Sequence, residues 1–188
     1  INLNCNFIFS SSSTVYGNSK RFPLTENMPL KNPTSPYGNT KKISEEILQD
    51  VTKKYKINVA CLRYFNPIGA HPSVLIGEKP IGEPIHIMPY ITQTALGIRD
   101  EVTIFGNNYN TYDGTCVRDY IHVMGVASAH AACIPFLNNT IQSKVHLFNI
   151  GRGEGLSVLD LVKKFIKYTK VKVKYKFGKR RTGDVAEL

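Results

Sequence analysis

The chain has 188 residues, of which 42% are hydrophobic and 10% aromatic, and this composition excludes a largely disordered protein. The formal net charge of +10 is concentrated late in the chain, where ten basic residues lie between Lys163 and Arg181. Because the sequence has neither a helix-turn-helix pattern nor an aromatic and basic pattern for single strands, we expect no nucleic-acid partner.

Hydropathy and cysteine spacing exclude two further classes. No apolar run approaches the roughly 18 residues of a membrane span, so we expect no membrane association. The chain starts at Ile1 rather than Met, and we therefore expect it to be part of a longer protein. The cysteines are far apart and have no histidine at zinc-ligand spacing, which predicts no metal site and reduced thiols in a cytoplasmic protein: Cys5, Cys61, Cys116 and Cys133.

The first predicted elements are a strand, a helix and a second strand. Residues 6–9 form a short apolar run that ends in serines, which favours a buried strand opening into a loop. A helix is predicted from Pro36, with Ser35 as its cap, and a strand over residues 57–65. Such a unit implies a parallel sheet whose ligand crevice lies at the carboxyl ends of the strands. The apolar positions of the helix recur at helical spacing: Ile43, Ile47, Leu48, Val51 and Tyr55.

Further elements are predicted downstream. Ser157 and Asp160 form a capping-box signature for a helix that ends near Thr169. Lysines alternate with apolar residues over 172–177, which predicts a strand with one wet and one dry face. The Pro- and Gly-rich stretch from Pro67 to Pro89 is a long connection, and we expect it to cover a ligand. The remaining predictions are helices over 88–99 and 124–137, and strands over 102–105, 119–122 and 146–151.

Tyr37 and Lys41 are either a catalytic pair or ordinary helix surface. Residues four apart share a helix face, so the Lys41 ammonium can approach the Tyr37 phenol. A free tyrosine has a pKa of about 10, so only about one in a thousand is ionised at pH 7. A nearby ammonium favours the phenolate and makes a tyrosine base usable. The spacing alone is common on helix surfaces, but the preceding serine-ended strand favours the catalytic interpretation.

Longer motifs resemble a known family. The serine run followed by Y-x-x-x-K resembles the extended short-chain dehydrogenase/reductases, and the whole chain resembles the UDP-glucose 4-epimerase family within them. Related dehydratases and decarboxylases carry carboxylates where this chain has Ser13 and Thr14, which favours epimerisation. The motifs are "FIFSSSSTVYGN", "SPYGNTK", "LRYFNPIGAHPS", "IMPYITQTALG", "IFGNNYNTYDGTCVRDYIHV", "NIGRGEG" and "RRTGD".

The resemblance implies a reaction and roles at the sugar. It implies that NAD takes a hydride from the sugar C4 of UDP-galactose or UDP-glucose and returns it to the other face of a 4-keto intermediate. Tyr37 would take the hydroxyl proton, and Ser12 would hydrogen-bond the same oxygen. Lys41 would lower the Tyr37 pKa and contact the nicotinamide ribose. Tyr64 and Phe65 would border the nicotinamide, so the cofactor-binding residues would be Tyr37, Lys41, Tyr64 and Phe65.

The resemblance also implies the substrate-binding residues. Phe105 would line the uracil pocket, and arginines would hold the diphosphate by charge and a fork of donors. The alternatives are an Arg118–Asp119 ion pair and a solvated Arg181. The implied set is Ser12, Ser13, Thr14, Asn66, His86, Ile87, Phe105, Arg118, Arg181 and Asp184.

The resemblance divides the chain into two regions of an α/β fold. Residues 1–66 would be the carboxyl-terminal part of a Rossmann-like, doubly wound NAD-binding domain with the Tyr/Lys helix. Residues 67–188 would mostly form a smaller α/β substrate-binding region, with residues 119–150 returning to the Rossmann domain. We expect a homodimer that pairs through two helices, one of them the Tyr/Lys helix.

Some positions depart from the family pattern. His86 replaces an asparagine that contacts the diphosphate, which predicts weaker UDP-sugar binding. Val74 and Cys116 replace glycines and Gly125 an aspartate, and each change could disturb a local turn. The Gly-rich turn that cradles NAD lies before Ile1 in the family, so we expect these 188 residues alone to be inactive. The alternative is a non-catalytic protein that keeps the fold without full cofactor binding.

Overall fold

In the computed structural model, which describes residues 5–19 and 21–188, the chain divides into two units. The first unit combines Ile1–Pro67 with Ile121–Gly153, and the second combines Ile68–Tyr120 with Glu154–Leu188. The chain passes from one unit to the other three times, within the short strand β3 (Asn66–Ile68), within β5 (Val117–His122), and between Gly153 and Glu154.

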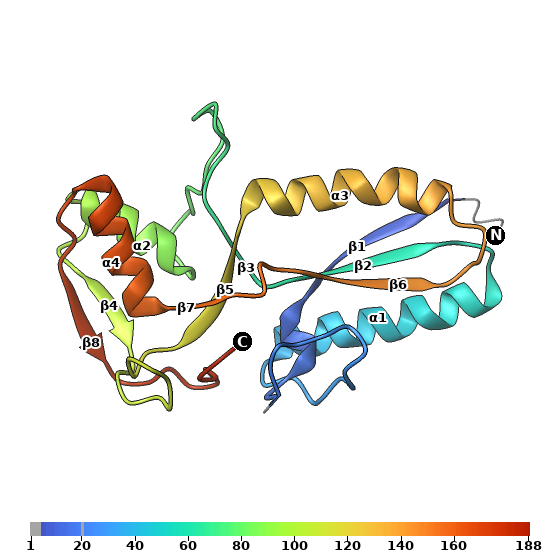
Figure 1. Ribbon diagram of the computed structural model, residues 1–188, viewed down its shortest axis with the longest axis horizontal. Coiled ribbons are helices and arrows are strands. Elements are labelled where there is room, and N and C mark those ends of the chain that lie inside the picture. The colour runs from blue at the N-terminus through green and yellow to red at the C-terminus, as the bar shows by residue number, and fades with distance from the viewer. Residues whose placement is uncertain (1–4, 20) are drawn as a thin grey trace. The chain divides into compact units, whose positions relative to one another are not determined.

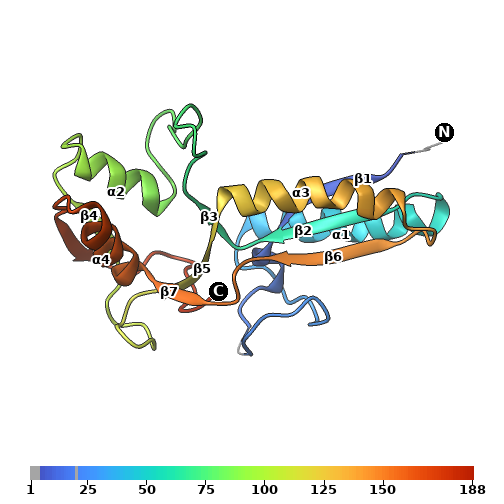
Figure 2. The same cartoon turned by 45° about the horizontal axis from the view of Figure 1, so that its top comes forward.

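The first unit is built on a parallel sheet of β1 (Phe7–Ser12), β2 (Val59–Tyr64) and β6 (Val145–Ile150), in the order β1-β2-β6. Ser12 lies opposite Tyr64, and Tyr64 opposite Ile150, so the three carboxyl ends are level. Figures 1 and 2 show α1 (Pro36–Lys54) on one face of this sheet and α3 (Val123–Asn138) on the other. The predicted α/β class with a doubly wound parallel sheet is confirmed.

The first strand is longer than the sequence predicted. Ser10, Ser11 and Ser12 all pair with β2, so the strand continues three residues beyond the apolar run. A short 3-10 helix, η1 (Ser13–Tyr16), follows at once. The serine run therefore begins inside the sheet and ends in a turn, which fixes the backbone that carries the hydroxyls.

Apolar side chains fill both faces of this sheet. Successive residues of β2 alternate between the faces, as a pleated strand requires. The α3 side is packed by Ala60, Leu62, Cys133 and Leu137, and the α1 side by Ile57, Val59 and Cys61. Burying one large aliphatic side chain contributes about 1.5–3 kcal/mol, so these two layers hold both helices to the sheet.

The predicted apolar stripe of α1 is only partly buried. Leu48 and Val51 pack against the sheet, but Ile43 and Ile47 are 44% and 56% exposed. In contrast, Glu45 is fully buried. The inward face of α1 thus includes a carboxylate, because that carboxylate has a buried partner on β2.

That partner is Arg63, and the two form a bidentate ion pair. Arg63 Nε lies 3.0 Å from Glu45 Oε1, and Arg63 Nη2 lies 2.7 Å from Glu45 Oε2. The Ser11 hydroxyl donates to Glu45 Oε1 at 2.5 Å, and Arg63 Nη1 donates to the Tyr16 hydroxyl at 2.8 Å. Tyr16 in turn donates to Asn149 Oδ1 at 2.6 Å. This buried network joins α1 and η1 to all three strands of the sheet.

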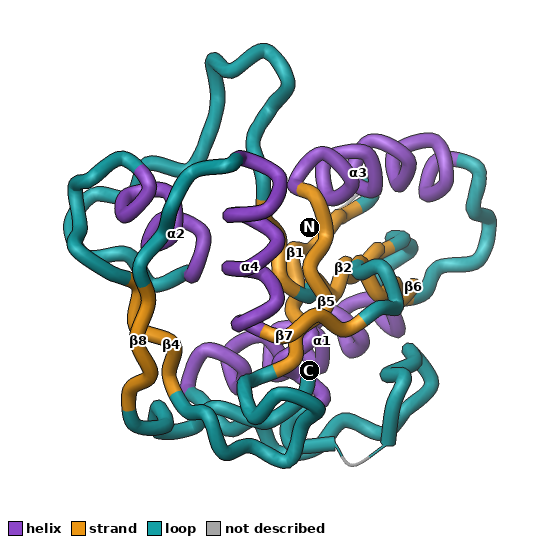
Figure 3. The backbone as a smooth tube through the Cα atoms, turned by 60° about the vertical axis from the view of Figure 1, so that its left-hand side comes forward, coloured by secondary structure: helices purple, strands orange, loops and turns teal. Residues whose placement is uncertain are grey.

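The second unit is smaller and mixed. β4 (Val102–Phe105) and β8 (Tyr175–Gly178) pair in parallel, and β7 (Gly155–Ser157) pairs antiparallel with β5. Figure 3 shows α2 (Ile87–Ala95) and α4 (Val158–Thr169) beside β4 and β8. The Ser157 hydroxyl accepts from the Asp160 amide at 2.9 Å, which confirms the predicted helix cap. The buried core includes Ile91, Val102, Ile104, Leu159, Val162 and Val173.

Two predictions in the second unit are wrong. The strand predicted over 172–177 starts only at Tyr175, and only part of its predicted dry face is buried, since Val173 is 5% exposed but Tyr175 and Phe177 are 37% and 45% exposed. The helix predicted to residue 99 ends at Ala95. Gly97 has a φ of 72°, a left-handed conformation that does not continue a helix.

The loop after β3 contains a strained turn. The Val74 amide donates to the His71 carbonyl at 3.0 Å, and Val74 has a φ of 62°. A β-branched residue in this left-handed region is an outlier, because its Cβ crowds the backbone. Val74 is 90% exposed, so burial of its side chain does not offset the strain. The expected disturbance of this turn therefore takes the form of backbone strain.

Replacing Val74 with glycine should raise the free energy of unfolding by about 0.5–1 kcal/mol, because relieved strain exceeds the backbone entropy that glycine loses. Chemical denaturation measures this change. The matched control is Leu75→Gly, at a neighbour that is 89% exposed and does not have positive φ. Leu75→Gly should lower stability by about 0.5–1 kcal/mol. Equal losses in both variants would contradict the strain.

Replacing Arg63 with methionine should lower the free energy of unfolding by about 3–5 kcal/mol, because the Glu45 carboxylate stays buried without its partner. The double variant Glu45→Leu/Arg63→Met should recover most of the loss. Asp50→Asn is the control, since it breaks the exposed Lys53–Asp50 pair, whose side chains are 74% and 77% accessible. Its effect should stay within about 0.5 kcal/mol. If Arg63→Met and Asp50→Asn lower the free energy of unfolding equally, the buried ion pair contributes no more to stability than the exposed one.

Candidate functional site

Tyr37 and Lys41 lie in the first two turns of α1. The Ser35 hydroxyl accepts from the Gly38 amide at 3.1 Å and caps the helix as predicted. Lys41 Nζ donates to the Ser10 carbonyl oxygen at 2.8 Å, and it lies 5.5 Å from the centroid of the Tyr37 ring. Tyr37 is 55% exposed, so a ligand can reach it. The ammonium is thus held between the end of β1 and the tyrosine.

The serine run closes one side of this region. Ser12 is 6% exposed, and its Oγ accepts from the Thr14 amide at 3.2 Å and from the Thr14 hydroxyl at 2.9 Å. Ser12 is the acceptor in both contacts, so neither uses its own hydroxyl hydrogen. Ser13 is 1% exposed. A Cβ added at Gly38 would lie 2.8 Å from Pro33 Cβ and 3.3 Å from Thr14 Cβ, so glycine allows α1 to approach the run.

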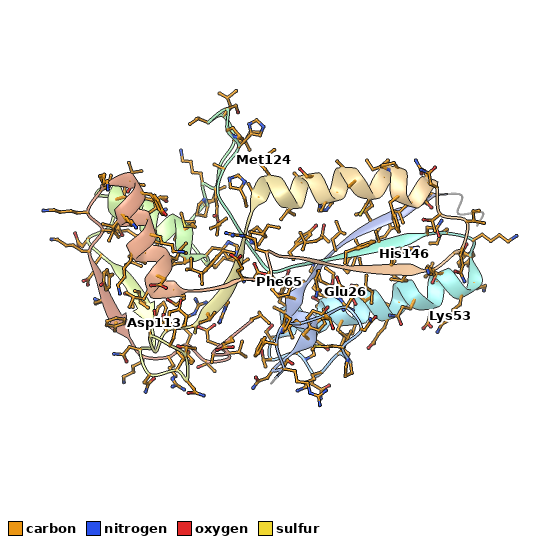
Figure 4. All side chains as sticks on the ribbon, viewed as in Figure 1. Glu26, Lys53, Phe65, Asp113, Met124 and His146 are labelled. Atoms are coloured by element: carbon orange, nitrogen blue, oxygen red, sulfur yellow. The ribbon has the colours of Figure 1, made fainter. Side chains whose placement is uncertain are left out.

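Tyr64 and Phe65 lie at the end of β2. The Tyr64 hydroxyl is 2.9 Å from Ser10 Oγ and 2.6 Å from His130 Nε2. Burial raises the pKa of Tyr64, the Ser10 hydrogen bond opposes this, and the nearby Tyr37 adds to it. The Phe65 amide donates to the Ile150 carbonyl at 3.1 Å, and Figure 4 shows Phe65 at this edge of the sheet. Asn66, the next residue, begins β3 and is half-buried.

The first unit therefore brings four predicted residues to one place. Ser12 and Tyr64 are level at the carboxyl ends of β1 and β2, and the lysine on α1 reaches the same edge. The arrangement joins an exposed phenol, an ammonium and a buried hydroxyl. Such a set can hold an alcohol oxygen and accept its proton.

The second unit gathers another predicted set, here termed the arginine cluster: Phe105, Arg118, Arg181 and Asp184. Arg118 Nη2 donates to Asp184 Oδ1 at 3.5 Å, and Arg181 Nε lies 4.0 Å from Asp184 Oδ2. The Arg181 guanidinium carbon is 5.4 Å from the Phe105 ring centroid. Two guanidinium groups share one carboxylate, so the cluster keeps a positive charge that suits an anionic ligand.

Arg118 is fixed more firmly than Arg181. The Arg118 side chain is 12% accessible and its Nη1 donates to the Val117 carbonyl at 2.8 Å, whereas the Arg181 side chain is 54% accessible. Arg118 also forms an ion pair with Asp184. Arg118 is thus a fixed element of the cluster, and Arg181 has room to move.

His86 and Ile87 lie where α2 begins. His86 occupies the cap position without a side-chain capping bond, and its Nδ1 is 3.0 Å from Glu78 Oε1. Because a carboxylate only accepts, Nδ1 carries the proton, and in the neutral imidazole Nε2 is then an acceptor. Ile87 packs against the core of the second unit. In this arrangement the neutral His86 ring does not donate from Nε2 to a diphosphate.

Sequence reasoning missed four residues that organise the first unit: Ser10, Glu45, Arg63 and His130. One signal was present, because Arg63 interrupts the apolar strand VACLRY, and a charge in a buried strand requires a partner. Nothing comparable marked His130. Its contact with Tyr64 joins α3 to β2, and such pairing between distant segments depends on the fold.

The described residues fit one end of a dinucleotide cofactor. Lys41 offers donors for ribose hydroxyls, and the half-buried aromatic rings of Tyr64 and Phe65 suit the wall of a nicotinamide pocket. The printed sequence contains no G-x-G-x-x-G turn for the pyrophosphate. Within the described residues, no group of three or more His, Cys, Asp or Glu could hold a metal ion, and no helix is long and apolar enough to cross a membrane.

Comparisons with known proteins agree with this geometry. Residues 2–151 match the family described as "NAD dependent epimerase/dehydratase family". UDP-glucose 4-epimerase of Drosophila melanogaster is 50% identical over 181 residues, which are 96% of this chain and 52% of that protein. The human UDP-glucose 4-epimerase is 47% identical over 182 residues, 96% of this chain and 52% of the human protein. The chain spans about half the length of the curated relatives it matches.

Solved structures give the same result. UDP-glucose 4-epimerase from Stenotrophomonas maltophila, with bound NAD and formylated UDP-arabinopyranose, has a TM-score of 0.91 and 46% identity, covering 97% of this chain and 54% of that one. The Bifidobacterium longum enzyme, in complex with NAD+ and UDP, has a TM-score of 0.91 and 43% identity, with the same coverage of each chain. The partial Rossmann-like fold predicted from the sequence is confirmed.

Proposed function

The chain belongs to the NAD dependent epimerase/dehydratase family, and we propose that it carries the catalytic and nucleotide-binding residues of a UDP-glucose 4-epimerase. The reaction would interconvert UDP-galactose and UDP-glucose through a 4-keto sugar, with NAD as resident cofactor. The observation that carries this proposal is the position of Lys41, whose ammonium bridges the Ser10 carbonyl and the exposed face of Tyr37.

Three residues would act on the sugar. Tyr37, as phenolate, takes the proton of the 4-hydroxyl, and it later returns the proton to the 4-oxygen. Ser12 would donate its hydroxyl hydrogen to the same oxygen and orient it, because its Oγ already accepts from Thr14. Lys41 favours the phenolate by its charge, and its remaining N–H groups suit a ribose hydroxyl. When bound, NAD supplies a hydride acceptor that gives the hydride back to the opposite face of the sugar.

The arginine cluster would hold the UDP part. Arg118 and Arg181 present N–H groups to the diphosphate, and Asp184 accepts from ribose hydroxyls. Phe105 is 41% exposed, so its ring offers an apolar surface to the uracil. Ser13, Thr14, Asn66, His86 and Ile87 remain proposed substrate contacts. Because Glu78 holds the His86 Nδ1 proton, we propose a weaker diphosphate contact there than an asparagine would make.

Assembly and location are part of the same proposal. We infer a cytoplasmic homodimer that pairs through α1 and a second helix. Exposed apolar residues on α1 support this interface, because Ile43 and Ile47 are 44% and 56% exposed on a helix whose opposite face is buried. On α3, Ile134 and Phe136 are 57% and 41% exposed and offer a second apolar surface.

The proposal predicts the effect of Tyr37→Phe in the native protein, including any sequence that flanks residues 1–188. Conversion of UDP-galactose to UDP-glucose should slow by about 10²- to 10⁴-fold, because the proton acceptor is lost. Tyr55→Phe, which changes a tyrosine at the far end of α1, should keep full activity. Full activity in Tyr37→Phe would reject the role of Tyr37. No turnover in the unsubstituted protein with NAD present would favour the non-catalytic alternative.

A further inference from the structure

Asn149 lies near the carboxyl end of β6, where it pairs in register with Arg63 of β2. Its Oδ1 accepts from the Tyr16 hydroxyl at 2.6 Å, and its Nδ2 donates to the Leu24 carbonyl at 2.9 Å. Its backbone amide donates to Glu26 Oε1 at 2.7 Å, and Glu26 is labelled in Figure 4. One residue of the sheet is thus bonded both to η1 and to the loop that follows η1.

The chemistry of the partners fixes the direction of these bonds. A guanidinium group only donates, so the Tyr16 hydroxyl accepts from Arg63 Nη1 and has its single hydrogen left for Asn149. The Leu24 carbonyl only accepts, so it requires the nitrogen of the Asn149 amide. Exchanging the amide oxygen and nitrogen would set Oδ1 against the Leu24 carbonyl, and two acceptors do not bond. The Asn149 side chain therefore has one orientation that satisfies both partners.

The loop held by Asn149, here termed the connecting loop, consists of residues 21–34 and leads towards α1. Leu24 is 9% exposed, whereas Phe22 in the same loop is 45% exposed. Leu24 and Glu26 are thus the points at which the connecting loop is tied to β6, and Asn149 is the partner at both. A loop without a regular hydrogen-bonded structure of its own depends on such ties for a fixed position.

Both ends of the connecting loop lead to residues of the candidate site. Before the loop, η1 is capped by Ser12, and Thr14 within η1 donates to Ser12 Oγ from its amide and its hydroxyl. After the loop, Ser35 caps α1 two residues before Tyr37. A change in the position of η1 moves Thr14, and with it the direction of the Ser12 hydroxyl hydrogen. The ties at Asn149 therefore act on the groups proposed to meet the sugar.

We propose that Asn149 is a positioning residue that fixes η1 and the connecting loop, and thereby holds Ser12 and Tyr37 in the arrangement that the sugar requires. The inference rests on the proposed function, because this arrangement matters only in that reaction. Asn149 touches neither substrate nor cofactor in this account. It acts through its bonds to Tyr16, Leu24 and Glu26.

Hydrogen exchange of the native protein tests the ties without any assay of activity. In Asn149→Ala, amide exchange over residues 21–34 should become at least about tenfold faster, because two of the three bonds to Asn149 are lost. Amides of β2 should stay protected, which shows that the sheet is still folded. The matched control is Asn138→Ala, which removes the exposed 3.0 Å bond from Asn6 Nδ2 and should leave exchange over residues 21–34 unchanged. Unchanged exchange over residues 21–34 in Asn149→Ala would overturn the proposal.

Kinetics and nucleotide binding test whether the ties serve the reaction. In folded Asn149→Ala, kcat for UDP-galactose should fall about tenfold, because the groups at the sugar are misplaced. The Kd for UDP, measured by calorimetry, should stay the same, because the arginine cluster takes no part in the bonds of Asn149. Asn138→Ala should keep both values. A purely structural Asn149 would lower stability and leave the kcat of the folded variant unchanged, and that result would overturn the proposal.

A pair of variants at Glu26 tests the third bond and supplies a rescue. Glu26→Gln keeps a side-chain oxygen that accepts from the Asn149 amide, so it should keep most of the kcat, whereas Glu26→Ala removes the acceptor and should lower kcat. Equal losses in the two variants would count against the proposal, because the hydrogen bond would then not place the loop. Without turnover in the unsubstituted protein, the proposed function and the positioning role fail together. Hydrogen exchange then still shows whether Asn149 holds the connecting loop.

Discussion

The buried ion pair between Glu45 and Arg63 is the constraint on which the first unit depends. Both side chains are almost fully removed from water, so each charge requires the other, and the two parallel hydrogen bonds allow only one relative placement of α1 and β2. Tyr37, Lys41 and Glu45 follow one another at four-residue spacing along the same helix face. Fixing Glu45 therefore fixes the rotation of α1 that turns Lys41 toward the end of β1.

Three consecutive serines of β1 further define how α1 is placed against the sheet. The carbonyl of Ser10 receives the Lys41 ammonium, the hydroxyl of Ser11 donates to Glu45, and Ser12 ends the strand with its Oγ engaged by Thr14. Each serine thus has a different partner, set by the alternation of the strand. The serine that would meet the sugar is held by the same strand that anchors the helix. The geometry of the proposed chemistry is therefore a consequence of how the sheet and helix are joined.

The helix caps and the helical spacing of α1 could be predicted from the sequence, because they depend on residues close together in the chain. The cap at Ser35, the cap at Ser157 and the helical spacing in α1 act over a few residues, so a pattern reveals them. The inward position of Glu45 escaped prediction because carboxylates are rarely buried, and helical spacing instead favoured Ile43 and Ile47. Contacts such as Tyr64 with His130 join residues 66 apart, and periodicity carries no information about them. The alternation over 172–177 gave a wrong prediction because it is typical of a strand with one buried face. The side chains of β8 are instead exposed on both faces of the strand.

The most direct test of this account is the kcat of Arg63→Lys in the native protein, measured where the variant is fully folded. Lysine keeps the buried positive charge, but it cannot form two parallel bonds to Glu45 or replace the bond to Tyr16. The account predicts that kcat for UDP-galactose falls at least about tenfold, because a small displacement of the Tyr37 end of α1 spoils the reactive geometry. A folded Arg63→Lys variant with unchanged kcat would show that the ion pair holds the fold together without aligning the site.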